Sequence, residues 1–177
     1  NGGGSAPGVT NGYVGIGFDE YGNFSNLTST GCSATYPCVV TPNQVVVRGA
    51  GNGTSGYPVL AAASATIATG SRADAYTVRI TITPAPNPVL TVERDTGAGF
   101  TTLISGLSLA GNGPVPATFK MGFSAATGGL NNFHEIRFAS VLNANGTATS
   151  VPTIGAGGLA VMMAAIALMA AWTRRRR

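Results

Sequence analysis

The chain has few charged residues, a single histidine and only two cysteines. Charged residues make up 9% of its 177 residues, and four of the ten basic ones are the terminal residues Arg174 to Arg177. Six basic and six acidic residues remain in the rest of the chain, so that part carries no net charge. Nucleic-acid binding needs a basic patch on the folded domain, and the missing patch excludes this class of function.

The shortage of cysteine and histidine also limits metal and redox chemistry. Cys32 and Cys38 lie in one loop-like stretch, and they supply only half of a structural zinc site. No second thiol pair and no cluster of histidines completes such a site. A disulfide between Cys32 and Cys38 is therefore predicted for an exported protein, and a metal or redox pair is the alternative.

The acidic residues do not form a catalytic pair. Neighbouring strand residues point to opposite faces, so neither Asp19 with Glu20 nor His134 with Glu135 can face one cleft. Retaining glycosidases need two carboxyl groups about 5 Å apart across such a cleft. Ser124 lacks the glycine two residues later that a nucleophile elbow requires. We expect no enzyme activity.

The composition that remains is rich in glycine, threonine, serine, asparagine and valine, which favours strands and turns. Strands are predicted at residues 12–18, 44–48, 76–83, 89–94, 119–124 and 134–142, with a turn at 95–97. The alanine-rich residues 60–69 are compatible with a short helix. The pattern predicts an all-β, antiparallel sandwich or barrel.

The end of the chain has a different character. The nineteen uncharged residues Ile154 to Trp172 would span roughly 28 Å as a helix, close to the thickness of a bilayer core. Basic clusters stay in the cytoplasm, so residues 1–150 are predicted to lie outside. The predicted organisation is a β-domain at 1–142, a polar linker at 143–153, and a transmembrane helix with its arginine cluster at 154–177.

The stretch after the first predicted strand offers oxygen ligands. The Asp19 carboxylate, the Tyr21 carbonyl and the Asn23 side chain are hard ligands that suit Ca²⁺. The alternative is a strand-ending turn in which Asp19 and Asn23 make local hydrogen bonds. Spacing alone leaves both open.

Two segments together resemble the L-type lectin family, the legume-lectin-like sandwiches and their bacterial relatives. They are Phe18-Asp-Glu-Tyr-Gly-Asn23 and Gly122-Phe-Ser-Ala-Ala-Thr-Gly128, the latter followed by His134-Glu-Ile136. The resemblance covers roughly residues 10–142. It implies a concanavalin A-like jelly-roll sandwich that binds carbohydrate without chemistry.

The resemblance also implies which residues bind. Asn23 would hydrogen-bond sugar hydroxyls, Tyr21 would offer an apolar face to a pyranose ring, and the loop from Gly128 to Asn132 would line the rim. The implied carbohydrate-binding residues are Tyr21, Gly22, Asn23, Gly128, Gly129, Leu130 and Asn131. Asp19, Tyr21 and Asn23 would be the metal ligands, with Ca²⁺ as the ion.

The chain departs from the family in two respects. Gly17 and Thr28 stand where the plant proteins have further acidic metal ligands, so the calcium site is short of donors. Several strands precede the metal loop in the family, whereas few residues precede Asp19 here. The expectation is that the sequence begins inside a longer lectin-like protein, with the N-terminal part of the sandwich missing.

The tail resembles the IPTL-type C-terminal sorting signals of Gram-negative bacteria, which exosortase-like membrane proteases are thought to process. The resemblance rests on Val151, Pro152, Thr153 and Ile154 ahead of the apolar stretch, and on Arg174, Arg175, Arg176 and Arg177 after it. It implies export, an inner-membrane intermediate, and a final place at the cell surface or outside the cell. A plain single-span anchor is the alternative.

These observations predict an exported cell-surface protein that binds glycans non-covalently. One alternative is a structural or biofilm-matrix protein that keeps a lectin-like fold without binding sugar. A glycoside hydrolase of the same architecture would need two or three acids on one strand face, which the sequence lacks.

Overall fold

The computed structural model describes residues 8–25, 39–127, 129, 132–137, 140–143 and 148–149. The chain divides into two compact units, Asn1–His134 and Glu135–Arg177, which are described separately below. Of the predicted features, both cysteines, the transmembrane span and the sorting motif lie outside the described residues.

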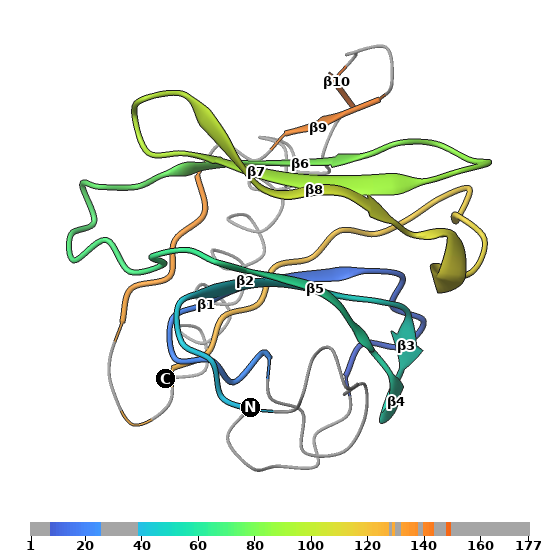
Figure 1. Cartoon of the computed structure of the whole chain (residues 1–177), viewed down its shortest axis with the longest axis horizontal. Helices are drawn as coiled ribbons and strands as arrows, with labels where there is room; N and C mark the ends of the chain where they lie inside the picture. Colours follow the sequence, from blue (N-terminus) through green and yellow to red (C-terminus); the bar gives the residue numbers. More distant parts are fainter. Residues whose placement is uncertain are drawn as a thin grey trace, which may run out of the picture. The chain divides into compact units, whose positions relative to one another are not determined.

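The first unit contains two three-stranded antiparallel sheets (Figure 1). The first has the order β1 (Gly15–Asp19), β2 (Gln44–Arg48), β5 (Val59–Ser64). The second has the order β6 (Thr77–Ile82), β7 (Val89–Asp95), β8 (Phe100–Ser108). A small hairpin of β3 (Gly51–Asn52) and β4 (Ser55–Gly56) follows β2, and the 3₁₀ turn η1 (Ala110–Asn112) follows β8. In the second unit β9 (Val141–Leu142) pairs with β10 (Ala148–Thr149).

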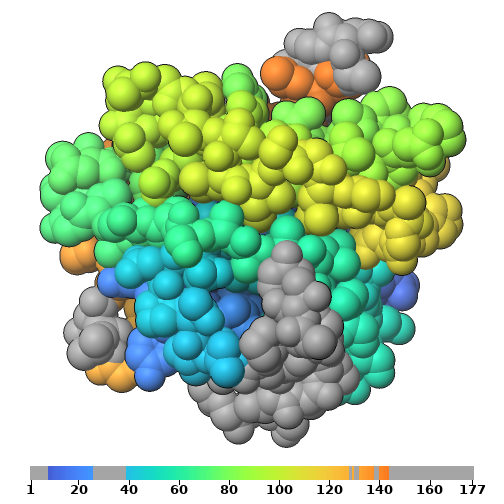
Figure 2. Space-filling model, viewed as in Figure 1, coloured from blue at the N-terminus to red at the C-terminus, as the bar shows by residue number. Residues whose placement is uncertain are grey.

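The two sheets of the first unit share one hydrophobic core. Val45 and Val47 of β2 belong to the same buried cluster as Leu90 and Val92 of β7. Each pair is two residues apart on its strand, so both side chains of a pair point to one face. Figure 2 shows the second sheet, green to yellow, lying directly against the cyan to teal residues of the first.

The structure confirms an all-β, antiparallel fold, and several strand predictions with it. Strand β2 has the predicted bounds, and β1, β6 and β7 fall within a few residues of theirs. The possible helix at residues 60–69 is wrong, because β5 occupies Val59–Ser64 and pairs with β2. Its small alanine side chains fit against the valines of β2, so tertiary pairing overrides their helix propensity.

The predicted strands at 119–124 and 134–142 are also wrong in the part of the chain that is described. Residues 119–124, 134–137 and 140 have no strand assignment, and only β9 falls within the second range. Phe119 and Phe123 are 69% and 60% exposed. Alternating apolar residues make a strand only where a sheet edge pairs with them, and no described edge does so here.

Within the described ranges, no helix is long and apolar enough to cross a bilayer.

An exposed ion pair on the second sheet gives that sheet a dependence on pH. The Arg79 guanidinium donates two hydrogen bonds to the Glu93 carboxylate, at 2.6 and 2.8 Å, and lies 3.9 Å from the centre of the Phe100 ring. The hydrogen bond from Arg79 lowers the pKa of Glu93 below its ordinary value of 4.5.

We therefore expect the contribution of this pair to be complete above pH 4.5 and to disappear as the pH falls through the lowered pKa of Glu93. Glu93→Gln should lower the free energy of unfolding slightly at neutral pH, where the parent has the ion pair, and the two proteins should converge below the lowered pKa of Glu93, where neither has it. The loss of stability between pH 7 and pH 3 should therefore be smaller in the variant. Urea unfolding from pH 7 down to pH 3 measures this, and an equal loss in both proteins would contradict the assignment.

Candidate functional site

The loop that follows β1 is held in shape by its first residue. The two carboxylate oxygens of Asp19 accept backbone N–H groups of the loop, one from Gly22 at 2.8 Å and one from Phe24. Hydrogen bonds from backbone N–H groups to an ionised carboxylate are stronger than those between neutral groups. Asp19 therefore fixes the path of residues 20–24.

A second set of contacts ties this loop to the segment before β2. The Ser25 hydroxyl donates to the Gly22 carbonyl at 2.7 Å and accepts the Thr41 N–H at 3.3 Å. Gly22 has φ +104°, and a Cβ there would come closer than 3.0 Å to the Thr41 backbone. Glycine is therefore required at this position both by the backbone angle and by the space.

The loop folds back over the outer face of the first sheet. The Phe24 ring lies over Gly17, where a Cβ would come closer than 3.0 Å to ring carbons, and a Cβ on Gly15 would lie 3.8 Å from it. Gly15 and Gly17 lie on the opposite face of β1 from Ile16 and Phe18, which pack against the core. The glycines thus make room for an aromatic ring on the outside of the sheet.

Arg48, the last residue of β2, holds the loop of residues 20–24 against the sheet. Its side chain is 4% exposed, and the guanidinium donates to the Phe24 carbonyl from Nε at 2.8 Å and from Nη2 at 2.6 Å. Nη1 donates to the Tyr57 carbonyl at 2.7 Å, and the guanidinium carbon lies 5.3 Å from the centre of the Phe24 ring. Burial lowers the pKa of Arg48 from 12.5 to about 10, because desolvation penalises the charged form.

The loop of residues 20–24 contacts the second predicted binding segment, which ends at Asn132. The Asn132 side-chain amide donates to the Glu20 carboxylate at 2.8 Å, across 112 positions of sequence. Tyr21, beside Glu20, is 67% exposed. Phe133, beside Asn132, is 74% exposed, and the Arg72 guanidinium carbon lies 5.0 Å from the centre of its ring. We call Glu20, Tyr21, Asn132 and Phe133 the rim.

The predicted binding residues have different places. Tyr21 is exposed beside the hydrogen bond of the rim, Gly22 is buried as the turn glycine, Asn23 is half-buried and Gly129 is exposed. Gly128, Leu130 and Asn131 lie outside the described residues. The structure therefore brings the two predicted segments together through Glu20 and Asn132.

Of the four rim residues, the sequence predicted Tyr21 and Asn132 as part of a binding site and gave no such indication for Glu20 and Phe133. Glu20 stood out only as a possible catalytic partner of Asp19. The signal that could have pointed to Phe133 is an aromatic residue directly after the asparagine pair Asn131-Asn132.

The described residues do not make a good fit to a calcium ion. Both oxygens of Asp19 already accept N–H groups of its own loop, and Ca²⁺ takes six to eight oxygen ligands. Within the described ranges no group of three or more His, Cys, Asp or Glu side chains gathers as a metal site would require. The geometry gives Asp19 a positioning part in the loop.

Comparison with known proteins bears on the end of the chain. Residues 149–177 match a family model described as the IPTL-CTERM motif. The match indicates the C-terminal sorting signal of an exported surface protein, which implies membrane-anchored sorting and processing by an exosortase-like system. No curated protein and no solved structure matches the chain.

Proposed function

We propose that this chain is an exported protein of the Gram-negative cell surface that binds glycans non-covalently at the rim. The observation that carries the proposal is the hydrogen bond between Asn132 and Glu20, which joins the two loops that the lectin resemblance implies. Flanking that bond are two exposed aromatic rings, Tyr21 and Phe133.

Aromatic rings suit the apolar face of a sugar. The C–H groups of a pyranose form an apolar surface that packs on an aromatic face, and the hydroxyl groups at its edge need hydrogen-bond partners. A largely exposed ring stacks in this way only if its position is fixed beforehand, because ordering a side chain on binding costs affinity. The Asp19, Ser25 and Arg48 contacts hold the backbone directly after Tyr21, at Gly22 and Phe24.

The polar groups of the rim suit sugar hydroxyls. The Glu20 carboxylate has acceptor capacity beyond the bond from Asn132, and hydroxyl groups donate well to a charged acceptor. The same geometry favours binding over hydrolysis. A retaining glycosidase needs two carboxyl groups that face the scissile bond, and the Asp19 carboxylate is directed into its own loop.

The proposal extends to the fold and the location. We infer that the two sheets are part of a concanavalin A-like jelly-roll sandwich. This is supported by two antiparallel sheets that bury one face each in a common core. The neutral body, free of the terminal arginines, suits a domain exposed to the outside of the cell.

Binding to a glycan array tests the proposed function. The full chain, kept in a detergent without a sugar headgroup, should bind a subset of glycans, and Tyr21→Ala should weaken that binding at least tenfold, about 1.4 kcal/mol. Asn132→Ala should weaken it as well. Phe100→Ala, which removes an exposed ring from the second sheet, is the matched control and should bind as the parent does.

We further propose that the tail is a sorting signal that is cleaved off, so that the mature protein ends near residue 151. The apolar stretch and Arg174–177 would then be absent from the surface form. Intact-mass analysis of protein recovered from the cell surface should show a C-terminus near Val151. A surface form that still contains Trp172 would establish a permanent anchor instead.

A further inference from the structure

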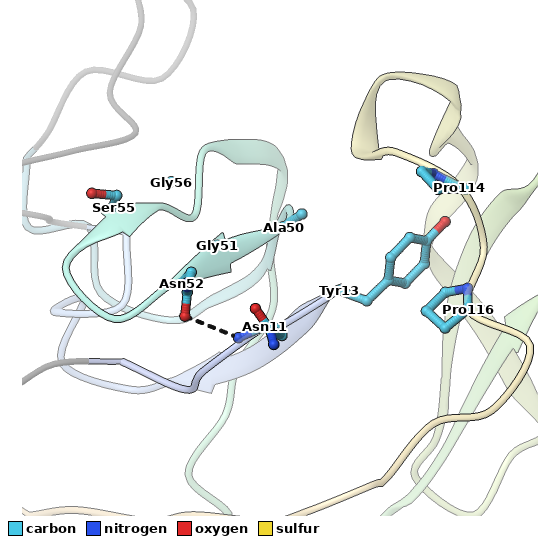
Figure 3. Close-up of a pocket in the computed structure, with 10 residues that line it drawn as sticks. Asn11, Tyr13, Ala50, Gly51, Asn52, Ser55, Gly56, Pro114 and Pro116 are labelled. Carbon is cyan, nitrogen blue, oxygen red and sulfur yellow. Dashed lines mark hydrogen bonds between the residues drawn. The ribbon is translucent and has the colours of Figure 1, made fainter.

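A second recess lies at the other end of β1 from the rim. It is an open pocket of about 670 Å³ between the β3–β4 hairpin and the chain after η1. Its principal side chains are those of Asn11, Tyr13, Asn52, Ser55, Pro114 and Pro116 (Figure 3). Ligand pockets of about 300–1,000 Å³ accommodate small molecules, so this one has room for a disaccharide.

Hydrogen bonds beneath the pocket hold its walls in place. The side chain of Asn112 is 8% exposed, and its amide donates to the Tyr13 carbonyl while its oxygen accepts the Ala50 N–H. Gly12 and Gly51 exchange backbone hydrogen bonds of 2.8 and 2.9 Å. The segment that carries Tyr13 and the segment that leads into the hairpin are therefore joined before any ligand arrives, which lowers the entropy cost of binding.

The hairpin side of the pocket offers a few polar groups and no charge. Asn52 Oδ1 accepts the Asn11 N–H at 3.2 Å, which orients the amide so that its NH₂ group remains available as a donor (Figure 3). Ser55, on the same hairpin, is exposed and adds a hydroxyl that both donates and accepts. No acidic or basic residue lines the pocket, so neither an anion nor a cation finds a counter-charge there.

The opposite wall is apolar, and the one polar side-chain atom behind it has no hydrogen-bond partner in the part of the chain that the structure describes. The Tyr13 ring reaches toward Pro114 and Pro116 in Figure 3. Its hydroxyl is buried and has no hydrogen-bond partner among the described residues. Because the hydroxyl is buried, this wall presents the Tyr13 ring and the two prolines, an apolar surface, to the pocket.

We propose that this pocket is a second binding site, separate from the rim, for a neutral saccharide. The ring of such a ligand packs against Tyr13 and the two prolines, while its hydroxyl groups bond Asn52 and Ser55. The five residues of β1, at about 3.3 Å each, place roughly 15 Å of strand between the pocket and the rim. The pocket and the rim are therefore made of different residues and lie apart on the strand.

Saturation-transfer NMR on the full chain in dodecylphosphocholine micelles tests the site. The probes are cellobiose and N,N′-diacetylchitobiose, with digalacturonate as the charged comparison. We expect saturable binding of at least one neutral probe and weaker binding of digalacturonate. Asn52→Asp keeps the acceptor for the Asn11 N–H but removes the amide donor, so it should weaken the neutral probe about tenfold. Ser55→Ala should weaken it as well.

The rim variants separate this site from the proposed function. Tyr21→Ala should leave binding of the neutral probe unchanged, since Tyr21 lies beyond the far end of β1. Failure of both neutral probes to bind would overturn the second site, as would binding that survives both Asn52→Asp and Ser55→Ala. Loss of probe binding in Tyr21→Ala alone would assign the probe to the rim and also overturn it. Thermal melting of each variant verifies that it remains folded.

Discussion

Replacing Arg48 with methionine should lower the free energy of unfolding by about 2–4 kcal/mol and abolish binding at the rim. The substitution removes three hydrogen bonds and leaves the partly buried carbonyls of Phe24 and Tyr57 without these donors. Removing a charge that burial already disfavours offsets part of that loss. The loop that presents Tyr21 then loses the contact that returns it to the sheet.

Urea unfolding and glycan binding measure the two effects. Arg48→Lys is the matched control, because it keeps the charge but replaces a planar fork of donors by a single ammonium group. It should fall between the parent and the methionine variant in both measurements. A methionine variant with the stability and glycan binding of the parent would contradict the assignment of Arg48 as the fastening residue.

Gly17→Ala should displace Phe24 from the sheet and cost about 1–3 kcal/mol, even though it adds a single methyl group. That methyl group would come closer than 3.0 Å to the Phe24 ring, which rests on the bare backbone of β1. Once the ring moves, the Phe24 N–H leaves Asp19 and the Phe24 carbonyl leaves Arg48. We expect loss of glycan binding together with the loss of stability.

Gly15→Ala supplies the control on the same strand and the same face. A Cβ at Gly15 would lie 3.8 Å from the Phe24 ring, an ordinary contact, so this variant should be neutral or slightly more stable. Thermal unfolding of the Gly15→Ala and Gly17→Ala variants measures the difference in their stability. Equal stability of the two alanine variants would mean that Phe24 does not depend on the glycine beneath it.

Local patterns in the sequence predicted four of the strands that contribute to the core, β1, β2, β6 and β7. Val45 and Val47 alternate with residues of the opposite face, and a strand with that pattern needs only a neighbour on each side to become the centre of a sheet. The same pattern at 119–124 gave a wrong prediction, because alternation does not reveal whether a sheet edge is available. Strand β8, after the Asp95–Gly97 turn, was missed because glycine and serine interrupt its apolar residues.

The candidate site was predictable in part. The Asp19–Asn23 loop and the segment after Gly122 carry recognisable residue types, so both could be named in advance as candidate binding segments. The contact between Glu20 and Asn132 spans 112 positions and depends on how the chain folds, which no local pattern encodes. Burial of Arg48 against carbonyl groups rather than a carboxylate was equally hidden, since arginine in an antiparallel strand normally indicates an exposed face.

Glycan binding by the folded full chain, compared side by side with its Tyr21→Ala variant on one array, tests the central claim most directly. Tyr21 is 67% exposed, so its truncation should leave the melting temperature nearly unchanged. The account predicts a defined set of glycans bound by the parent and at least tenfold weaker binding of the same set by the variant. A folded parent that binds no glycan, or a variant that binds the same set equally well, would contradict it.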